Sequence, residues 1–363
     1  MLLKRKLFVA AVFCGILFLM IATHTIQRNN ILSLPRHLGL ADGPAPSSPT
    51  PAVRGPDGGK QAQPSSLPSP GPSSLKTDLA VARVCGCPSC VGDVGTSEWF
   101  GKRYDPKQQP FLLDHGGSLN PLDLRWWLAL QRSGDDQTLQ EVKEKMFQVI
   151  SSPSLDVAPH PNQCRTCAVV GNSGNLLGAS YGKLIDTHNT VIRMNKAVTV
   201  GFEEHVGNRT THHLMYPESA VDLSNGVHLV LVPFKLRDLQ WVASALSTGE
   251  IKTTYMRVKD RVRADKDKVI VVNPLFFKYA HDNWNEAHGR YPSTGMLAII
   301  FALHICDQVS VFGYGADQHG NWHHYWEENR NAGAFRKTGV HSADFETQVI
   351  HRLDDEGKIR LHT

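Results

Sequence analysis

The stretch that decides the fold is CAVVGNSGNLLGASYGKLIDTHNTVIRMN, residues 167–195. It holds two short apolar runs, Ala168-Val169-Val170 and residues 190–192, and each is followed by small polar residues that include Asn172 and Asn195. An apolar run, a glycine-rich turn, a helical stretch and a second apolar run predict strand, turn, helix and strand. Ligands of open α/β sheets bind outside the carboxyl ends of the strands. We therefore expect both asparagines to face one crevice, the candidate active site.

The glycine spacing of the first turn is not that of a dinucleotide-binding fingerprint. Gly171-Asn172-Ser173-Gly174 departs from G-x-G-x-x-G, and Arg193-Met194-Asn195 stands where an acidic residue would close the second strand. A redox cofactor is therefore not expected. Small amides and hydroxyls suit the base and sugar edges of a nucleotide, because they offer directional hydrogen bonds without charge. The alternative is a polar turn that caps a helix, and this stretch alone favours that alternative.

The rest of the chain predicts further alternation of strands and helices. Strands are expected over residues 210–216, 227–234, 269–272 and 309–312, with helices over residues 236–246 and 296–305. Such alternation indicates an α/β fold with a doubly wound, mostly parallel sheet. Residues 85–166 look mostly helical and irregular, and we expect Trp126 and Trp127 there to be core residues rather than a ligand platform.

The amino terminus carries a membrane signal. Lys4-Arg5-Lys6 precedes a continuous apolar segment, and no acidic residue occurs before Asp42. No convincing cleavage site follows, so we expect an uncleaved signal-anchor with its amino terminus in the cytosol. The next segment is rich in Pro, Ser and Gly, cannot bury a core and is expected to be an extended stem. The expected organisation is a cytosolic tail (1–6), a transmembrane signal-anchor (7–24), a stem (25–84) and a lumenal catalytic domain (85–363).

Six of the seven cysteines lie in the expected lumenal domain, where oxidising conditions favour disulfides. Their spacing leaves all fifteen pairings open. A zinc site built from Cys85-x-Cys87-x-x-Cys90 and Cys164-x-x-Cys167 is the alternative, which a lumenal location disfavours. The sequon Asn208-Arg209-Thr210 predicts an N-glycosylation site. The net charge of +4 is small and the basic residues are scattered, so nucleic acid is not an expected partner.

Two further segments carry candidate functional residues. Ser293 and Thr294 precede an apolar helix and are good cap residues, so the helix start would offer free backbone N–H groups to an anion; a capped core helix is the alternative. The end of the chain is rich in histidine but lacks the H-E-x-x-H pattern of a zinc helix. These histidines are His319, His323, His324, His341 and His351. Asp265-Lys266-Asp267 matches a metal-binding D-x-D pattern, but it lies among basic residues and is expected to be a solvated turn.

Four segments, in order along the chain, resemble the motifs of one family. They are Cys167-Ala168-Val169-Val170-Gly171-Asn172-Ser173-Gly174, Tyr291-Pro292-Ser293-Thr294-Gly295 through Cys306, His324-Tyr325-Trp326-Glu327, and His341 with Glu346. The chain from Cys85 to Thr363 resembles the eukaryotic sialyltransferases, glycosyltransferase family 29. It is most similar to the group that places sialic acid on O3 of galactose in Galβ1,3GalNAc. The resemblance implies a Rossmann-like variant GT-A fold, CMP-sialic acid as donor, inversion at the transferred sugar, and no metal or other cofactor.

The resemblance also implies roles for individual residues. His341 would be the general base, and His324 would stabilise the leaving phosphate. The chemistry agrees, because the acceptor hydroxyl needs a base that titrates near the working pH and the departing phosphate needs a hydrogen-bond donor. The other implied contacts are Asn172, Ser173 and Asn195 to cytidine and ribose, Ser293, Thr294 and Gly295 to the nucleotide, Tyr255 and Tyr291 to the phosphate, and Gln131, Tyr291 and Trp322 to the acceptor galactose.

The same resemblance implies the disulfide pairs Cys85–Cys90, Cys87–Cys164 and Cys167–Cys306, and a single-pass type II location in the Golgi membrane. Glycoproteins and glycolipids stay open as acceptors, and a homodimer stays open as an assembly. Two other functions remain as alternatives. One is a sialyltransferase with another acceptor or linkage, and the other is a lumenal lectin-like protein that keeps the fold without turnover.

Overall fold

The computed structural model describes residues 84–93, 95–115, 120–131, 137–153, 158–316, 319, 322–328 and 339–363. All of them belong to one compact unit, Thr77–Thr363. The expected tail, signal-anchor and nearly all of the stem lie outside the described residues. Within the described part, no helix has the length and apolar character needed to cross a membrane.

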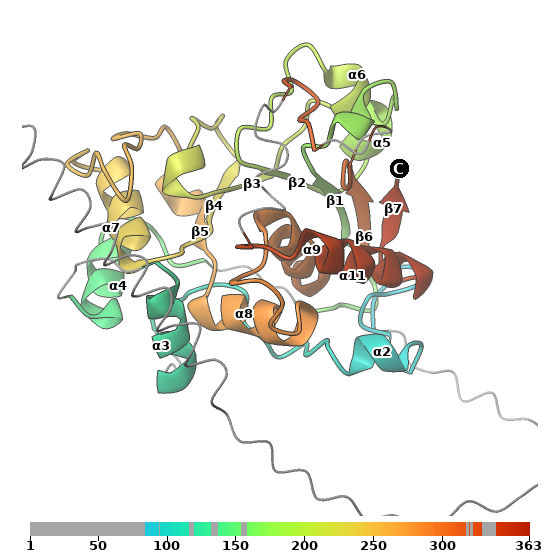
Figure 1. Ribbon diagram of the computed structural model, residues 1–363, viewed down its shortest axis with the longest axis horizontal. Coiled ribbons are helices and arrows are strands. Elements are labelled where there is room, and N and C mark those ends of the chain that lie inside the picture. The colour runs from blue at the N-terminus through green and yellow to red at the C-terminus, as the bar shows by residue number, and fades with distance from the viewer. Residues whose placement is uncertain are drawn as a thin grey trace, which may run out of the picture. The chain divides into compact units, whose positions relative to one another are not determined.

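The unit is built on a parallel sheet with the strand order β5-β4-β3-β2-β1-β6-β7. Every neighbouring pair of these strands runs parallel, which agrees with the predicted mostly parallel sheet. The chain fills one side of β1 with β2 to β5 and then crosses to the other side with β6 and β7 (Figure 1). The strands are β1 Thr166–Val170, β2 Thr190–Met194, β3 His212–Met215, β4 His228–Leu231, β5 Val269–Val271, β6 Gln308–Phe312 and β7 Arg360–His362.

Both faces of the sheet are buried, as a doubly wound fold requires. Alternate residues of β1 point to opposite faces. Cys167 and Val169 join the larger hydrophobic cluster, whereas Ala168 and Val170 join a separate smaller one. This burial on both sides explains why the strand sequence is continuously apolar instead of alternating.

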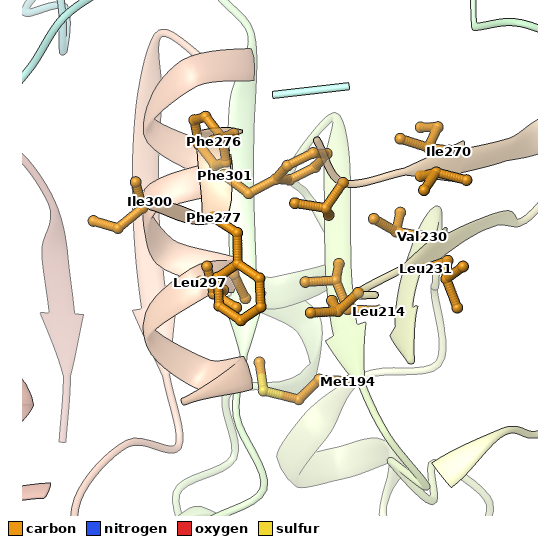
Figure 2. Packing of buried hydrophobic residues seen from close by; sticks show 14 of the residues in the cluster. Met194, Leu214, Val230, Leu231, Ile270, Phe276, Phe277, Leu297, Ile300 and Phe301 are labelled. Atoms are coloured by element: carbon orange, nitrogen blue, oxygen red, sulfur yellow. The ribbon is translucent and has the colours of Figure 1, made fainter. Parts of the chain in front are cut away.

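Helices supply the rest of both hydrophobic clusters. The helix α9 is buried along nearly its whole length, and its apolar side chains pack with those of α8 and the central strands (Figure 2). The smaller cluster is closed by residues of α5 and α6, which lie apart from α9 and α11 (Figure 1). The helices are α2 Glu98–Gly101, α3 Pro121–Leu130, α4 Leu139–Phe147, α5 Gly182–Asp186, α6 Glu203–Val206, α7 Leu236–Ala245, α8 Pro274–Tyr279, α9 Thr294–Ile305 and α11 Ala343–Asp355.

The structure differs from the sequence prediction at the connection between β1 and β2. The helix expected directly after the first turn is a short 3-10 turn, Gly174–Leu176, and the α-helix begins only at Gly182. The backbone between them is left-handed at Gly178 and Ser180, with φ of 82° and 53°. A left-handed residue breaks a right-handed helix, so the helical segment is divided.

Three disulfides join the cysteines of the described unit. They pair Cys85 with Cys90, Cys87 with Cys164, and Cys167 with Cys306. This is the pairing that the resemblance implied, and it consumes the thiolates that the alternative zinc site would need. The D-x-D segment also has a structural task, because Asp265 caps a 3-10 turn before β5 by accepting a hydrogen bond from the Asp267 N–H.

Candidate active site

A pocket of about 360 Å³ opens at the carboxyl ends of the central strands. It lies where the chain order reverses between β1 and β6, the usual ligand position in an open α/β sheet. The predicted crevice is therefore present, with both asparagine clusters in it. The residues around the pocket include residues 171–173 after β1, Asn195 after β2, Tyr216 after β3, residues 293–296 at the start of α9, residues 313–315 after β6, residues 322–324, His341 and Glu346.

Two asparagines that line one wall of the pocket each hold a buried amide oxygen. The side-chain nitrogen of Asn172 donates to the Met194 carbonyl at 3.2 Å, which leaves Oδ1 of Asn172 buried without a hydrogen-bond partner among the described residues. The Oδ1 atom of Asn195 is buried and unpartnered in the same described set. Buried acceptors of this kind are costly unless a ligand or water satisfies them. A nucleotide can do so with its ribose hydroxyls or the amino group of its base.

The backbone holds Asn195 in position for this role. Its φ of 58° is left-handed, a conformation that asparagine tolerates better than most residues. Its N–H donates to the Leu214 carbonyl at 2.8 Å, and its carbonyl oxygen lies 2.6 Å from Nε2 of His213. Burial lowers the pKa of His213. A neutral ring that donates from Nε2 therefore locks the turn in which Asn195 sits.

The start of α9 forms a second wall. Ser293 is the N-cap, and its hydroxyl accepts from the Met296 N–H at 3.1 Å. The N–H groups of Thr294 and Gly295 find no acceptor among the described residues, so they are free for an anion. The Tyr314 hydroxyl donates to the Gly295 carbonyl at 2.9 Å and braces the turn from behind. Complete burial raises the pKa of Tyr314, which keeps this donor protonated.

A buried carboxylate ties this helix start to α11. Oε1 of Glu346 accepts from the Ser293 N–H at 2.8 Å and from the Asn285 side chain at 3.0 Å. Hydrogen bonds to a carboxylate are stronger than those between neutral groups. Glu346 is thus a positioning residue for the α9 start. The sequence does not reveal this role, because Glu346 and Ser293 are far apart along the chain.

The two predicted catalytic histidines both line the pocket, and their supports differ. Nδ1 of His341 lies 2.9 Å from the Tyr291 carbonyl oxygen. Nδ1 of His324 lies 3.0 Å from the Glu327 carboxylate, and its ring stacks on Trp326 with centroids 4.5 Å apart. One imidazole is therefore backed by a neutral acceptor and the other by a charged one.

Three predicted substrate residues lie outside the lining of this pocket. Tyr291 packs against His341 with ring centroids 5.1 Å apart, Tyr255 is exposed, and Gln131 follows α3. Trp322 does line the pocket, as do Asn172, Ser173, Asn195, Ser293, Thr294 and Gly295. The sequon residue Asn208 is exposed just after α6, which suits a glycosylation site.

Sequence reasoning missed a charged cluster beside these residues. Lys235, Asp238 and Glu218 are buried together, and Lys235 contacts Gln131. The available signal was the i,i+3 spacing of Lys235 and Asp238 directly after an apolar strand, where a solvated pair is not expected.

Fold and pocket together define an α/β protein with a site suited to a phosphorylated nucleotide. A profile described as "Glycosyltransferase family 29 (sialyltransferase)" matches residues 117–358. The chain belongs to this family and is a glycosyltransferase.

Curated relatives and solved structures are similar over most of the chain. The rat protein "CMP-N-acetylneuraminate-beta-galactosamide-alpha-2,3-sialyltransferase 2" is 56% identical over 278 residues, 77% of this chain and 79% of its own. The human "CMP-N-acetylneuraminate-beta-galactosamide-alpha-2,3-sialyltransferase 1" is 50% identical over 282 residues, covering 77% and 82%. A mammalian sialyltransferase crystal structure superposes with a TM-score of 0.72 at 45% identity, covering 77% of this chain and 99% of that chain. A second, in complex with Gal-beta-1-3GalNAc-ortho-nitrophenol, gives 0.70 at 45% identity, covering 77% and 98%.

Proposed function

We propose that this protein transfers sialic acid from CMP-sialic acid to O3 of the terminal galactose of Galβ1,3GalNAc, with inversion. The observation that carries the proposal is one pocket in which a free helix start and two imidazoles meet. The names of the relatives supply the donor class and the α-2,3 linkage, and the complexed relative supplies the acceptor disaccharide.

The donor would lie along the two walls already described. Asn172 and Asn195 would accept from the cytidine and ribose, together with Ser173, and the N–H groups of Thr294 and Gly295 would meet the phosphate. Tyr255 and Tyr291 would add hydrogen bonds to the phosphate from the acceptor side. With these donors in place, we propose that no metal is required and that the fold is a variant of GT-A.

His341 suits the role of general base because of its support. A backbone carbonyl can only accept, so the Tyr291 oxygen favours a proton on Nδ1 of His341 and leaves a lone pair on Nε2. Nε2 would take the proton of the galactose O3 hydroxyl as O3 attacks the anomeric carbon. The bond between that carbon and the phosphate oxygen breaks on the other face, and its electron pair stays with CMP.

His324 suits the leaving-group role for the opposite reason. The Glu327 carboxylate can only accept on one side of the ring, and the departing phosphate can only accept on the other. Only an imidazole that carries protons on both nitrogens satisfies both anions. Glu327 would therefore hold His324 in the form that stabilises negative charge on the phosphate.

The proposal also includes the cellular location of the protein and its partners. The basic residues before the apolar segment at the amino terminus support a type II anchor in the Golgi membrane. The three disulfides and the exposed Asn208 are compatible with a lumenal domain. The partners would be the donor nucleotide and galactose-terminated glycans, and nucleic acid would not be one.

The test separates the two histidines. His341→Ala should abolish transfer yet largely preserve CMP binding, because the base takes its proton from the acceptor hydroxyl and not from CMP. His324→Ala should slow transfer and also suppress the slow hydrolysis of CMP-sialic acid, which needs phosphate departure but no activated acceptor. Glu327→Gln should reproduce the His324 effect in weaker form, and Glu328→Gln is the matched control on the same exposed segment.

The assay uses CMP-sialic acid with Galβ1,3GalNAc, Galβ1,4GlcNAc and Galβ1,3GlcNAc, and measures transfer, donor hydrolysis and CMP affinity. Near-native transfer by a folded His341→Ala protein would remove it as the base. Preference for another disaccharide would replace the proposed acceptor.

A further inference from the structure

Three charged side chains are buried together beside Gln131, a residue assigned to the acceptor. The side chains of Lys235, Asp238 and Glu218 are 4%, 0% and 5% exposed. The Lys235 ammonium lies 2.8 Å from Oδ1 of Asp238 and 3.4 Å from Oε1 of Glu218. Burial raises the pKa of Asp238 to about 6, against the opposing effect of Lys235. Buried charges are costly to desolvate, and a hydrophobic replacement is often as stable, so stability alone does not account for them.

The third contact of Lys235 connects the buried cluster to a residue assigned to the acceptor. Its Nζ donates to Oε1 of Gln131 at 2.9 Å. A lysine ammonium has three N–H donors and no acceptor. Hydrogen bonds to Gln131 and Glu218 use two of them, and the Asp238 carboxylate is in ion-pair contact, so the Gln131 amide has to turn its oxygen toward the ammonium. Its nitrogen then faces away with two N–H donors, which no described residue accepts.

The two carboxylates hold the lysine in place. Asp238 lies in the first turn of α7, and its other oxygen accepts from the Phe234 N–H at 2.8 Å. Glu218 accepts a hydrogen bond from the Thr254 hydroxyl. The ring of Tyr255 covers the ammonium with its centroid 4.9 Å away, a cation–π contact. The lysine therefore has little freedom to release Gln131.

The cluster adjoins the proposed site of transfer. Phe234, next to Lys235 in the chain, packs against Tyr216 and Tyr291 with ring centroids 5.7 and 5.1 Å away. Tyr216 lines the pocket, and Tyr291 contacts His341. The same lysine touches Gln131, assigned to the acceptor, and Tyr255, assigned to the phosphate.

We propose that Lys235 is a positioning residue that fixes the Gln131 amide as a hydrogen-bond donor toward the acceptor galactose, with Asp238 and Glu218 as its supports. The inference rests on the proposed function, because it takes Gln131 as an acceptor contact. It adds a requirement on the substrate: the galactose oxygen that meets Gln131 has to accept a hydrogen bond.

The decisive variant is Gln131→Glu. It keeps the size of the side chain and an oxygen for Lys235, but it replaces the two N–H donors with a charged acceptor. The KM for Galβ1,3GalNAc should rise by roughly tenfold or more, the usual cost of one lost hydrogen bond to a ligand. The loss should appear in the acceptor KM more than in kcat, because saturating acceptor compensates for the weaker binding. An unchanged acceptor KM would overturn the proposal.

Lys235 is tested by Lys235→Met combined with Asp238→Asn, which removes one charge of each sign. The acceptor KM should again rise, and adding Gln131→Met should cause little further rise, because the lysine acts through that amide. A folded double variant with native acceptor KM would refute the role of Lys235. So would a triple variant in which the effects of the lysine and glutamine substitutions on the acceptor KM are fully additive. Lys259→Met is the matched control, since its pair with Asp222 has both side chains 38% exposed. If the double variant does not fold, Asp238→Asn alone tests the support of Lys235: the acceptor KM should rise, and a folded Asp238→Asn protein with native acceptor KM would refute the role of the cluster.

These outcomes are distinct from failure of the proposed function. A wild-type enzyme that does not use Galβ1,3GalNAc would remove the function itself. A wild-type enzyme that does, with Gln131→Met at native acceptor KM, would leave the transferase intact and remove Gln131 and Lys235 from acceptor binding.

Discussion

The disulfide between Cys167 and Cys306 should be the largest covalent contribution to the stability of the donor pocket. Cys167 lies in β1, directly before the turn that carries Asn172, and Cys306 ends α9, whose first residues line the pocket. The perturbation is the double variant Cys167→Ala with Cys306→Ala.

The magnitude follows from the length of chain that the bond closes. The two cysteines are 139 residues apart, and in the chain-entropy model such a loop restricts the unfolded state by about 5 kcal/mol. Cys85 and Cys90 are only 5 residues apart, which gives about 2 kcal/mol. The two pairs are equally buried, with exposures of 0% and 5% against 0% and 6%. Lost packing should therefore be similar, and loop length remains as the difference.

The assay is urea-induced unfolding at neutral pH of wild type and the two paired alanine variants. The free energy of unfolding should fall by about 3 kcal/mol more when the Cys167–Cys306 pair is removed than when the Cys85–Cys90 pair is removed. Equal losses in the two variants would refute the reasoning from loop length and would point to local packing as the source of the stabilisation.

Two further predictions concern pH and metal. Burial lowers the pKa of His304 to about 4, whereas the unfolded chain has a histidine pKa of about 6.5. Between these two pH values the unfolded chain binds a proton at this residue and the folded chain does not. The free energy of unfolding should therefore fall by roughly 2 kcal/mol between pH 7 and pH 5. His304→Leu should reduce this slope in urea unfolding at pH 7 and pH 5, and an unchanged slope would assign the acid sensitivity to other groups. Transfer should survive EDTA, because backbone N–H groups and hydroxyls meet the phosphate; a loss restored by Mn²⁺ would make Asp265 and Asp267 metal ligands despite their place in a capped turn.

Much of the fold can be predicted from local patterns in the sequence. The strands predicted over residues 227–234 and 309–312 appear as His228–Leu231 and Gln308–Phe312, and the helix over residues 236–246 appears as Leu236–Ala245. The predicted cap at Ser293 was also correct. Each of these signals extends over a few neighbouring residues, so burial, periodicity and capping can be recognised without knowing the partner elements.

The prediction for the connection after β1 was only partly correct, because it depended on a backbone conformation that local patterns do not fix. The sequence predicted one helix between the first turn and the second apolar run, but the left-handed residues Gly178 and Ser180 divide this segment. A glycine permits a left-handed conformation without requiring it, so the sequence alone does not decide where the chain uses that freedom.

The sequence by itself determined the sheet class, the polar strand ends that form the crevice, the helix start at Ser293, and an even set of cysteines for disulfides. Tertiary structure alone decided the strand order, the burial of Lys235 between Asp238 and Glu218, and the different supports of His341 and His324. It also left Gln131, Tyr255 and Tyr291 outside the lining of the donor pocket. The physical reason is range: a side chain's propensity and period act between near neighbours, whereas which carboxylate or carbonyl faces a given lysine or histidine depends on how distant segments pack.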